Sequence, residues 1–114
     1  MLKSLEKARL IAKASQDKKS VDPVIIEIKD LTVIADYFVV CSGESKTQVG
    51  AISDHINEEL RKSGIKPRTV EGADFNNWVL LDYGDVIAHV FDAETRSFYE
   101  LEKLWLDAPR ISIK

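Results

Sequence analysis

The chain has 114 residues, of which 45% are hydrophobic and 31% charged, and its formal net charge is −3. This length and composition are typical of a single globular domain that buries a core without disulfides or metal. The acidic balance argues against direct DNA or RNA binding, which needs a basic surface. No apolar run approaches the roughly 18 residues of a membrane span. The single cysteine, Cys41, lies in an apolar stretch, so we expect an inert buried thiol and a cytoplasmic protein.

The first third of the chain predicts one helix and two strands. Apolar or small residues recur at helical spacing over residues 2–16, and β-branched residues dominate residues 24–29. A second strand is expected over residues 36–41. The link between the two strands is too short for a crossover, so we expect them to be antiparallel.

The middle of the chain predicts the longest helix. Ser45 is its expected N-cap, Gln48 the capping-box partner, and Gly64 lies just past its end. A third strand over residues 65–71 would run parallel to the second strand, by the right-handed crossover rule. The helix would bury a stripe made of Val49, Ile52, Ile56 and Leu60.

A β-hairpin is predicted where two apolar runs flank the pair Tyr83-Gly84, which we expect to form a two-residue turn. This turn would place Leu80 opposite Ile87 and Trp78 opposite His89. Alternation then separates a compact aliphatic face from a mixed face. The mixed face carries Trp78, Leu80, Asp82, Ile87, His89 and Phe91.

The last helix is expected to begin at its N-cap Asp92 and to pair Arg96 with Glu100 at i,i+4. Residues 1–107 would form the single domain, and residues 108–114 a loose tail. The fold class is α/β (α+β), with a mixed five-stranded sheet and the order α-β-β-α-β-β-β-α. The inward-facing residues of the last helix would be Phe98, Leu101 and Trp105.

The mixed face allows two interpretations. It could complete a second core under another helix, since most large apolar residues are buried. Alternatively, it could be a partly open docking site with aromatic anchors, rimmed by Asp82 and Asp85. Residues 71–107 hold nine acidic side chains against two basic ones, and an acidic surface favours a basic partner. This charge distribution favours the docking site.

Residue patterns for catalysis or ligand binding are weak. The turn at residues 42–45 precedes a helix N-terminus and could hold an anion, but it has one glycine and carries Glu44, so capping explains it better. His55 and His89 are the only histidines, and neither has a partner at a familiar ligand spacing. We therefore expect no catalytic residues, no cofactor and no metal.

Five stretches of the sequence together resemble a known family. They are residues 35–43 (ADYFVVCSG), 54–55 (DH), 71–72 (EG), 78–91 (WVLLDYGDVIAHVF) and 99–105 (YELEKLW). In this order and spacing they closely resemble the ribosomal silencing factor family RsfS, also called Iojap. The resemblance extends over nearly the whole chain.

This resemblance implies a non-enzymatic factor that binds the large ribosomal subunit through ribosomal protein L fourteen. It would sterically block subunit joining and repress translation under nutrient limitation. The resemblance also implies a nucleotidyltransferase-like fold, and a degenerate nucleotide-binding protein is the alternative function. A homodimer through the same face is possible. The implied partner-binding residues are Trp78, Leu80, Asp82, Ile87, His89, Phe91, Arg96 and Tyr99.

Overall fold

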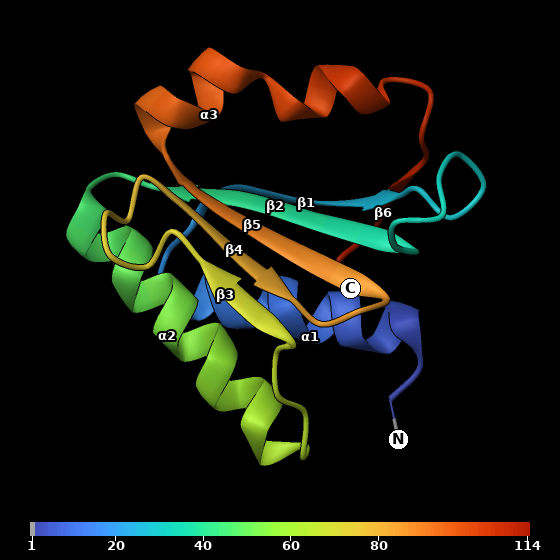
Figure 1. The fold of residues 1–114 in the computed structure, drawn as a ribbon, viewed down its shortest axis with the longest axis horizontal. Helices are drawn as coiled ribbons and strands as arrows, with labels where there is room; N and C mark the ends of the chain where they lie inside the picture. The colour runs from blue at the N-terminus through green and yellow to red at the C-terminus, as the bar shows by residue number, and fades with distance from the viewer. Residues whose placement is uncertain (1) are drawn as a thin grey trace.

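The computed structural model describes residues 2–114 and shows a three-layer α+β fold. A six-stranded sheet with the order β3-β4-β5-β2-β1-β6 lies between two helical layers. Two long helices, α1 and α2, cover one face of the sheet, and the short α3 and η1 cover the other (Figure 1). The elements are α1 (Ser4–Asp17), β1 (Val21–Glu27), β2 (Tyr37–Gly43), α2 (Lys46–Lys62), β3 (Thr69–Glu71), β4 (Trp78–Asp82), β5 (Val86–Asp92), α3 (Ala93–Tyr99), η1 (Leu101–Trp105) and β6 (Arg110–Ile111).

Helix α2 has the predicted caps and buried stripe. The Ser45 side chain accepts a hydrogen bond from the Gln48 backbone N–H at 3.1 Å. Gly64 adopts a positive φ of 77° just past the helix end, as a left-handed C-terminal residue does. The four predicted stripe residues are fully buried against α1 and the aliphatic sheet face: Val49, Ile52, Ile56 and Leu60.

The β4–β5 hairpin forms, but its register differs from the prediction by two residues. Trp78 lies opposite Phe91, and Leu80 lies opposite His89. The turn residues are Gly84 and Asp85, because the Tyr83 backbone N–H bonds the carbonyl of Val86 at 2.9 Å. Gly84 therefore takes the first turn position with φ 90°, which is where a type II′ turn requires glycine. A slip of two residues leaves every side chain on its predicted face.

The sheet order places the hairpin between β2 and β3. Strands β1 and β2 are antiparallel, as predicted. Strand β3 does run in the direction of β2, but it pairs with β4 at the edge of the sheet, and β5 is the parallel neighbour of β2. The sixth strand was not predicted.

The C-terminal region departs most from the prediction. Helix α3 ends at Glu100, which adopts a left-handed conformation with φ 49°, and the chain continues as the 3₁₀ helix η1. The break turns Phe98 outward, so that 78% of this residue is exposed rather than buried as predicted. Residues 110–111 are not loose, because they pair with β1 as strand β6.

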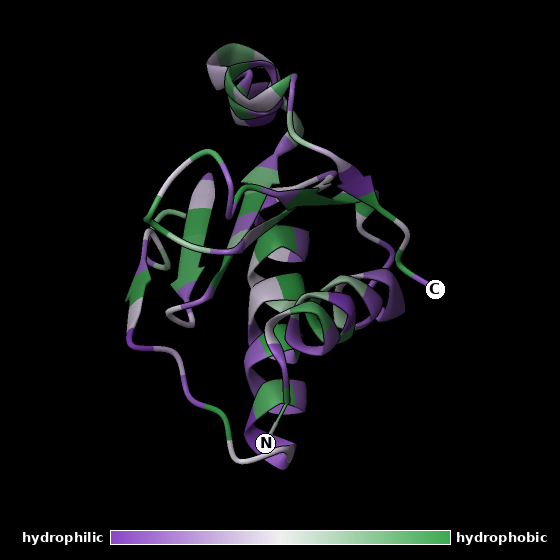
Figure 2. Ribbon diagram, turned by 90° about the vertical axis from the view of Figure 1, so that its right-hand side faces the viewer, coloured by the Kyte–Doolittle hydropathy of each residue, from purple (hydrophilic) through white to green (hydrophobic). Residues whose placement is uncertain are grey.

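The two faces of the sheet thus contact separate cores. The second core contains Phe38 and Phe91 and is covered by Leu101 and Trp105 of η1, which do point inward as predicted. Figure 2 shows the C-terminal helical layer as a separate band above the sheet. Within residues 2–114, no helix combines the length and apolar character needed to span a membrane.

Candidate docking site

The mixed face of the hairpin is only half covered by the second core. Ile87, His89 and Phe91 are buried in the second core, which corrects the expectation that they lie open to a partner. Trp78 and Leu80 are only partly buried. The difference arises because α3 lies over β5 and η1 packs on β2 through Trp105, whereas β4 lies nearer the edge of the sheet.

His89 positions Trp78 from within the core. The Trp78 indole N–H donates a hydrogen bond to His89 Nδ1 at 3.1 Å, and the Phe38 ring packs edge-on against the imidazole at 4.6 Å. Burial lowers the pKa of His89 to about 4, so the ring is neutral at pH 7. A neutral ring whose Nδ1 accepts a hydrogen bond fixes the orientation of the indole.

Trp78 forms the floor of a shallow hollow at the edge of the second face. Its ring packs between Phe91, at 4.8 Å, and Tyr99, at 4.9 Å between ring centroids. Tyr99 is 53% exposed and forms one wall. The hollow has a volume of about 350 Å³, and we call it the Trp78 hollow. It is lined by Glu71, Gly72, Asn77, Trp78, Leu80 and Tyr99.

At the rim of this hollow, the backbone conformation at position 72 requires a glycine. A Cβ atom at Gly72 would lie 2.0 Å from the Trp78 carbonyl oxygen, and the φ of 82° disfavours any other residue. The loop from β3 to β4 therefore lies directly against the backbone of Trp78. In the sequence, Gly72 stands out only as part of the family resemblance, and its place shortly before an apolar strand is the one signal of a close backbone contact.

Asp82 and Asp85 shape the hairpin rather than rim the hollow. Asp82 Oδ1 accepts a hydrogen bond from the Gly84 backbone N–H at 2.7 Å. Asp85 pairs with Lys7 of α1 at 2.7 Å and accepts a hydrogen bond from Ser4 at 2.7 Å. Burial opposes ionisation of Asp85, but the bonds from Lys7 and Ser4 outweigh it and hold its pKa below the usual value. Both acids lie at the other end of β4 from Trp78.

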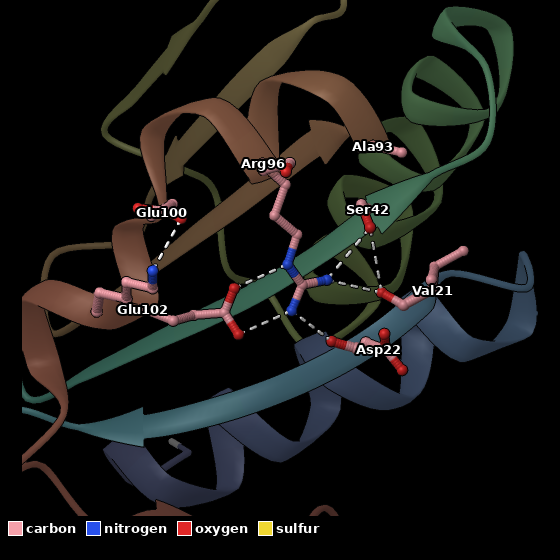
Figure 3. A pocket seen from close by; sticks show the side chains of 9 residues that line it. Val21, Asp22, Ser42, Ala93, Arg96, Glu100 and Glu102 are labelled. Carbon is pink, nitrogen blue, oxygen red and sulfur yellow. Dashed lines mark hydrogen bonds and ion pairs between the residues drawn. The ribbon is translucent and has the colours of Figure 1, made fainter.

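Arg96 is an internal latch, not an open binding residue. Its guanidinium donates hydrogen bonds to the carbonyls of Val21 and Asp22 at 2.9 and 2.8 Å, and to Ser42 Oγ at 3.2 Å (Figure 3). It also pairs with both carboxylate oxygens of Glu102, at 2.9 and 3.1 Å. The hydrogen bond from Arg96 lowers the pKa of Glu102, against the opposing effect of burial. The latch ties the C-terminal layer to β1 and β2.

The predicted pair between Arg96 and Glu100 does not form. Glu100 ends α3 and instead pairs with Lys103 at 2.9 Å. The groove beside the Arg96 latch has a volume of about 450 Å³. All five N–H groups of the guanidinium already donate to protein acceptors, so none is left for a ligand in this groove. Sequence reasoning missed Glu102 because the break at Glu100 changes the helical spacing.

The N-terminus of α2 is capped by the protein itself. The Glu44 backbone N–H donates to the Gln48 side chain at 2.6 Å, and Ser45 accepts from Gln48. A Cβ atom at Gly43 would already lie 3.0 Å from the Val49 nitrogen. Amides at a helix N-terminus are the groups that would hold a phosphate, and two of them here, those of Glu44 and Gln48, have protein acceptors.

A cluster of possible metal ligands lies elsewhere, where no metal was expected. On the face of the sheet that α1 and α2 cover, one ligand atom each from Asp17, His55 and Glu59 lies within 4.8 Å of the other two. Glu59 follows His55 by one helical turn, a spacing that the sequence analysis passed over. Cys41 is buried as expected, and burial raises the pKa of its thiol to about 12.

Comparison with known proteins identifies one family. Residues 2–114 match the family model described as "Ribosomal silencing factor during starvation". The chain is 43% identical to the ribosomal silencing factor RsfS of Bacillus subtilis over 89% of this chain and 86% of that one. It is 39% identical to RsfS of Halalkalibacterium halodurans over 96% and 93% of the two chains.

Solved structures agree with the sequence comparison. A crystal structure of a protein from Chromobacterium violaceum superposes with a TM-score of 0.90 at 30% identity, covering 97% of this chain and 92% of that chain. A second crystal structure, of a protein from Bacillus halodurans, gives a TM-score of 0.81 at 36% identity over 91% and 94% of the two chains. The chain therefore belongs to the ribosomal silencing factor (RsfS) family.

Proposed function

We propose that this protein represses translation by binding ribosomal protein L fourteen on the large ribosomal subunit and sterically blocking the small subunit. Membership of the ribosomal silencing factor family supports a role on the ribosome. The observation that carries the proposed site is the Trp78 hollow, where a fixed indole lies half open beside the exposed Tyr99. The protein would meet free large subunits in the cytoplasm.

The chemistry of the hollow suits a protein partner. Tryptophan and tyrosine are enriched among the residues that carry most of the energy of protein interfaces. Trp78 is held by His89, Phe91 and Tyr99, so little conformational entropy would be lost when a partner side chain packs on it. The hollow is shallow and lies at a sheet edge, which fits a protruding side chain or loop better than an enclosed small molecule.

The charge around the hollow favours a basic partner. Glu71 lines it, and Asp74 is exposed on the same β3–β4 loop. Five of the other seven acids in residues 71–107 are engaged within the protein: Asp82 with Gly84, Asp85 with Lys7, Asp92 with Thr95, Glu100 with Lys103, and Glu102 with Arg96. The attraction is therefore expected to be local to the β3–β4 loop, rather than spread over the whole C-terminal third.

The proposal treats the protein as a binding factor, not an enzyme. Its relatives are named as silencing factors, and two of the amides near the N-terminus of α2, those of Glu44 and Gln48, bond to protein acceptors. No observation favours the nucleotide-binding alternative.

The test is co-sedimentation of purified protein with isolated large subunits, followed by a subunit-joining assay. Tyr99→Ala should weaken binding about tenfold, because its ring forms one wall of the hollow. Val33→Ala is the matched control, since Val33 is a fully exposed aliphatic residue at the opposite end of the sheet. Equal affinity of Tyr99→Ala and the wild type would contradict the proposed site.

Self-association is the competing use of the same surface. Sedimentation velocity of the free protein separates the two: a dimer that Tyr99→Ala disrupts, with unchanged ribosome binding, would assign the hollow to a second copy of the chain. Normal binding of the wild type to large subunits, with no effect on subunit joining, would contradict the blocking step alone.

A further inference from the structure

Three side chains of different types meet where the end of α1 lies against α2. Asp17 is the last residue of α1, and His55 and Glu59 lie one turn apart on α2. Asp17 Oδ2 lies 3.0 Å from His55 Nε2. One ligand atom from each residue lies within 4.8 Å of the other two. One imidazole and two carboxylates therefore converge from two helices.

This set of atoms matches the ligand preference of zinc. Zn²⁺ binds imidazole nitrogen and carboxylate oxygen, and three protein ligands leave a fourth position for water. Calcium and magnesium prefer oxygen ligands alone, so the imidazole disfavours them. Ligand atoms 4.8 Å apart or less need only side-chain rotation to reach the roughly 2 Å bond lengths of a zinc site.

The surroundings of His55 support this assignment. Only 18% of the His55 side chain and 24% of the Glu59 side chain are exposed, so neighbouring residues restrict both. His55 Nδ1, the nitrogen that faces away from Asp17, lies 4.0 Å from Glu58 Oε2. A histidine that binds metal through one nitrogen usually presents the other to a carboxylate or carbonyl oxygen; Glu58 is the carboxylate on that side, at an ion-pair distance rather than a hydrogen-bond distance.

We propose that Asp17, His55 and Glu59 form a binding site for a zinc-class divalent cation that links the end of α1 to α2. The site lies in the layer formed by α1 and α2, on the opposite face of the sheet from the layer that carries Tyr99. It is therefore independent of the Trp78 hollow and of the proposed ribosome binding.

Lys62 competes with the cation for Glu59. Its ammonium group bonds Glu59 Oε2 at 2.6 Å, although 74% of the Lys62 side chain is exposed. A cation must displace this ammonium to use the carboxylate oxygen. Removing Lys62 should therefore strengthen zinc binding. If the acids attracted zinc only non-specifically, removing any other lysine of α2 should have the same effect.

The experiment is calorimetric titration of Zn²⁺ into the full-length, tag-free, metal-free protein. The wild type should bind one equivalent, and His55→Ala and Asp17→Asn should each weaken binding at least tenfold. Asp54→Asn is the matched control for Asp17→Asn, because it removes the same charge beside His55 in sequence without removing one of the three ligands; its affinity should stay within twofold. Lys62→Ala should bind several-fold more tightly, and Lys46→Ala, at the far end of α2, should not.

Circular dichroism confirms that each variant is folded before its affinity is compared. Asp17 is exposed, so Asp17→Asn keeps the test valid if His55→Ala fails to fold. Co²⁺ in place of Zn²⁺ should give the visible absorption of a site with nitrogen and oxygen ligands. Equal zinc binding by the wild type, Asp17→Asn and Asp54→Asn would overturn the proposal and leave only non-specific attraction to acids.

Discussion

On one face of the sheet, α1 and α2 cover an aliphatic core completely, whereas on the other face the short α3 and η1 leave Trp78 and Leu80 partly in solvent. The first face depends on two long helices with continuous apolar stripes. The second depends on a broken helical segment that the Arg96 latch holds to β1 and β2. The first face thus supplies most of the stability, and the second leaves an aromatic surface available for contact.

The largest effect should follow from truncation in the first core. Ile56→Ala removes a fully buried side chain of α2 and should lower the free energy of unfolding by about 3 kcal/mol. Leu80→Ala, on the half-covered face, should cost only about 1 kcal/mol because part of its surface already meets water. Urea denaturation measures both, and equal losses would contradict the difference between the faces.

The second core should be destabilised by acid through His89. Burial lowers its folded-state pKa to about 4, below the 6.5 usual for histidine, so the unfolded chain binds a proton more readily between these values. Stability is fully present above the unfolded pKa and is lost as the pH falls toward the folded one, by about 2 kcal/mol between pH 7 and pH 4.5. His89→Gln cannot titrate, so its stability should fall less over this range than that of the wild type; parallel curves would contradict a neutral buried His89.

Loss of the latch should loosen only the C-terminal layer. Arg96→Met keeps much of the side-chain length but removes the donors to Val21, Asp22, Ser42 and Glu102, at a cost of about 1.5 kcal/mol. Hydrogen exchange should accelerate in residues 93–105 and stay unchanged in α2. Equal acceleration in both layers would show that the two faces are not independent.

The smallest effect should come from the ion pair that joins α1 to the hairpin turn. Asp85→Asn weakens the bond to Lys7 and should cost about 0.5 kcal/mol at pH 7, because 34% of the Asp85 side chain is exposed and solvent screens the pair. The folded-state pKa of Asp85 is lowered, so this contribution is present above the unfolded pKa and is lost as the pH falls through the folded one. Thermal melting of the two proteins should therefore converge once the pH falls below the lowered folded-state pKa of Asp85, and a gap that persists in strong acid would contradict the ion-pair explanation.

The sequence predicted the parts of the fold that local patterns determine. Helix α2 carries a regular apolar stripe between a serine N-cap and a glycine, so its limits and buried face followed directly. The face of the sheet on which each hairpin side chain lies was also predicted correctly, because an error of two residues in register leaves the alternation of side chains unchanged. The left-handed Glu100 has no glycine to signal it, so the break before η1 and the exposure of Phe98 were not predictable from spacing.

For the candidate site, the sequence could predict only which residues share one face of the sheet. Alternation placed Trp78, Leu80, His89 and Phe91 on one side of the sheet, but it does not say how far another element covers them. That cover depends on the path of the chain after Glu100 and on the pairing of β6 with β1. Both are tertiary features, which explains why His89 and Phe91 proved buried while Trp78 stayed partly open.

The most direct test of the docking surface is a bulky label placed on it. Cys41 is buried and its thiol pKa is raised to about 12, so a cysteine introduced at the surface can be labelled selectively with a maleimide-linked polyethylene glycol. Labelled Tyr99→Cys should lose binding to isolated large subunits by tenfold or more, whereas labelled Val33→Cys should bind within twofold of the unlabelled protein. Undiminished binding of the protein labelled at position 99 would contradict the account.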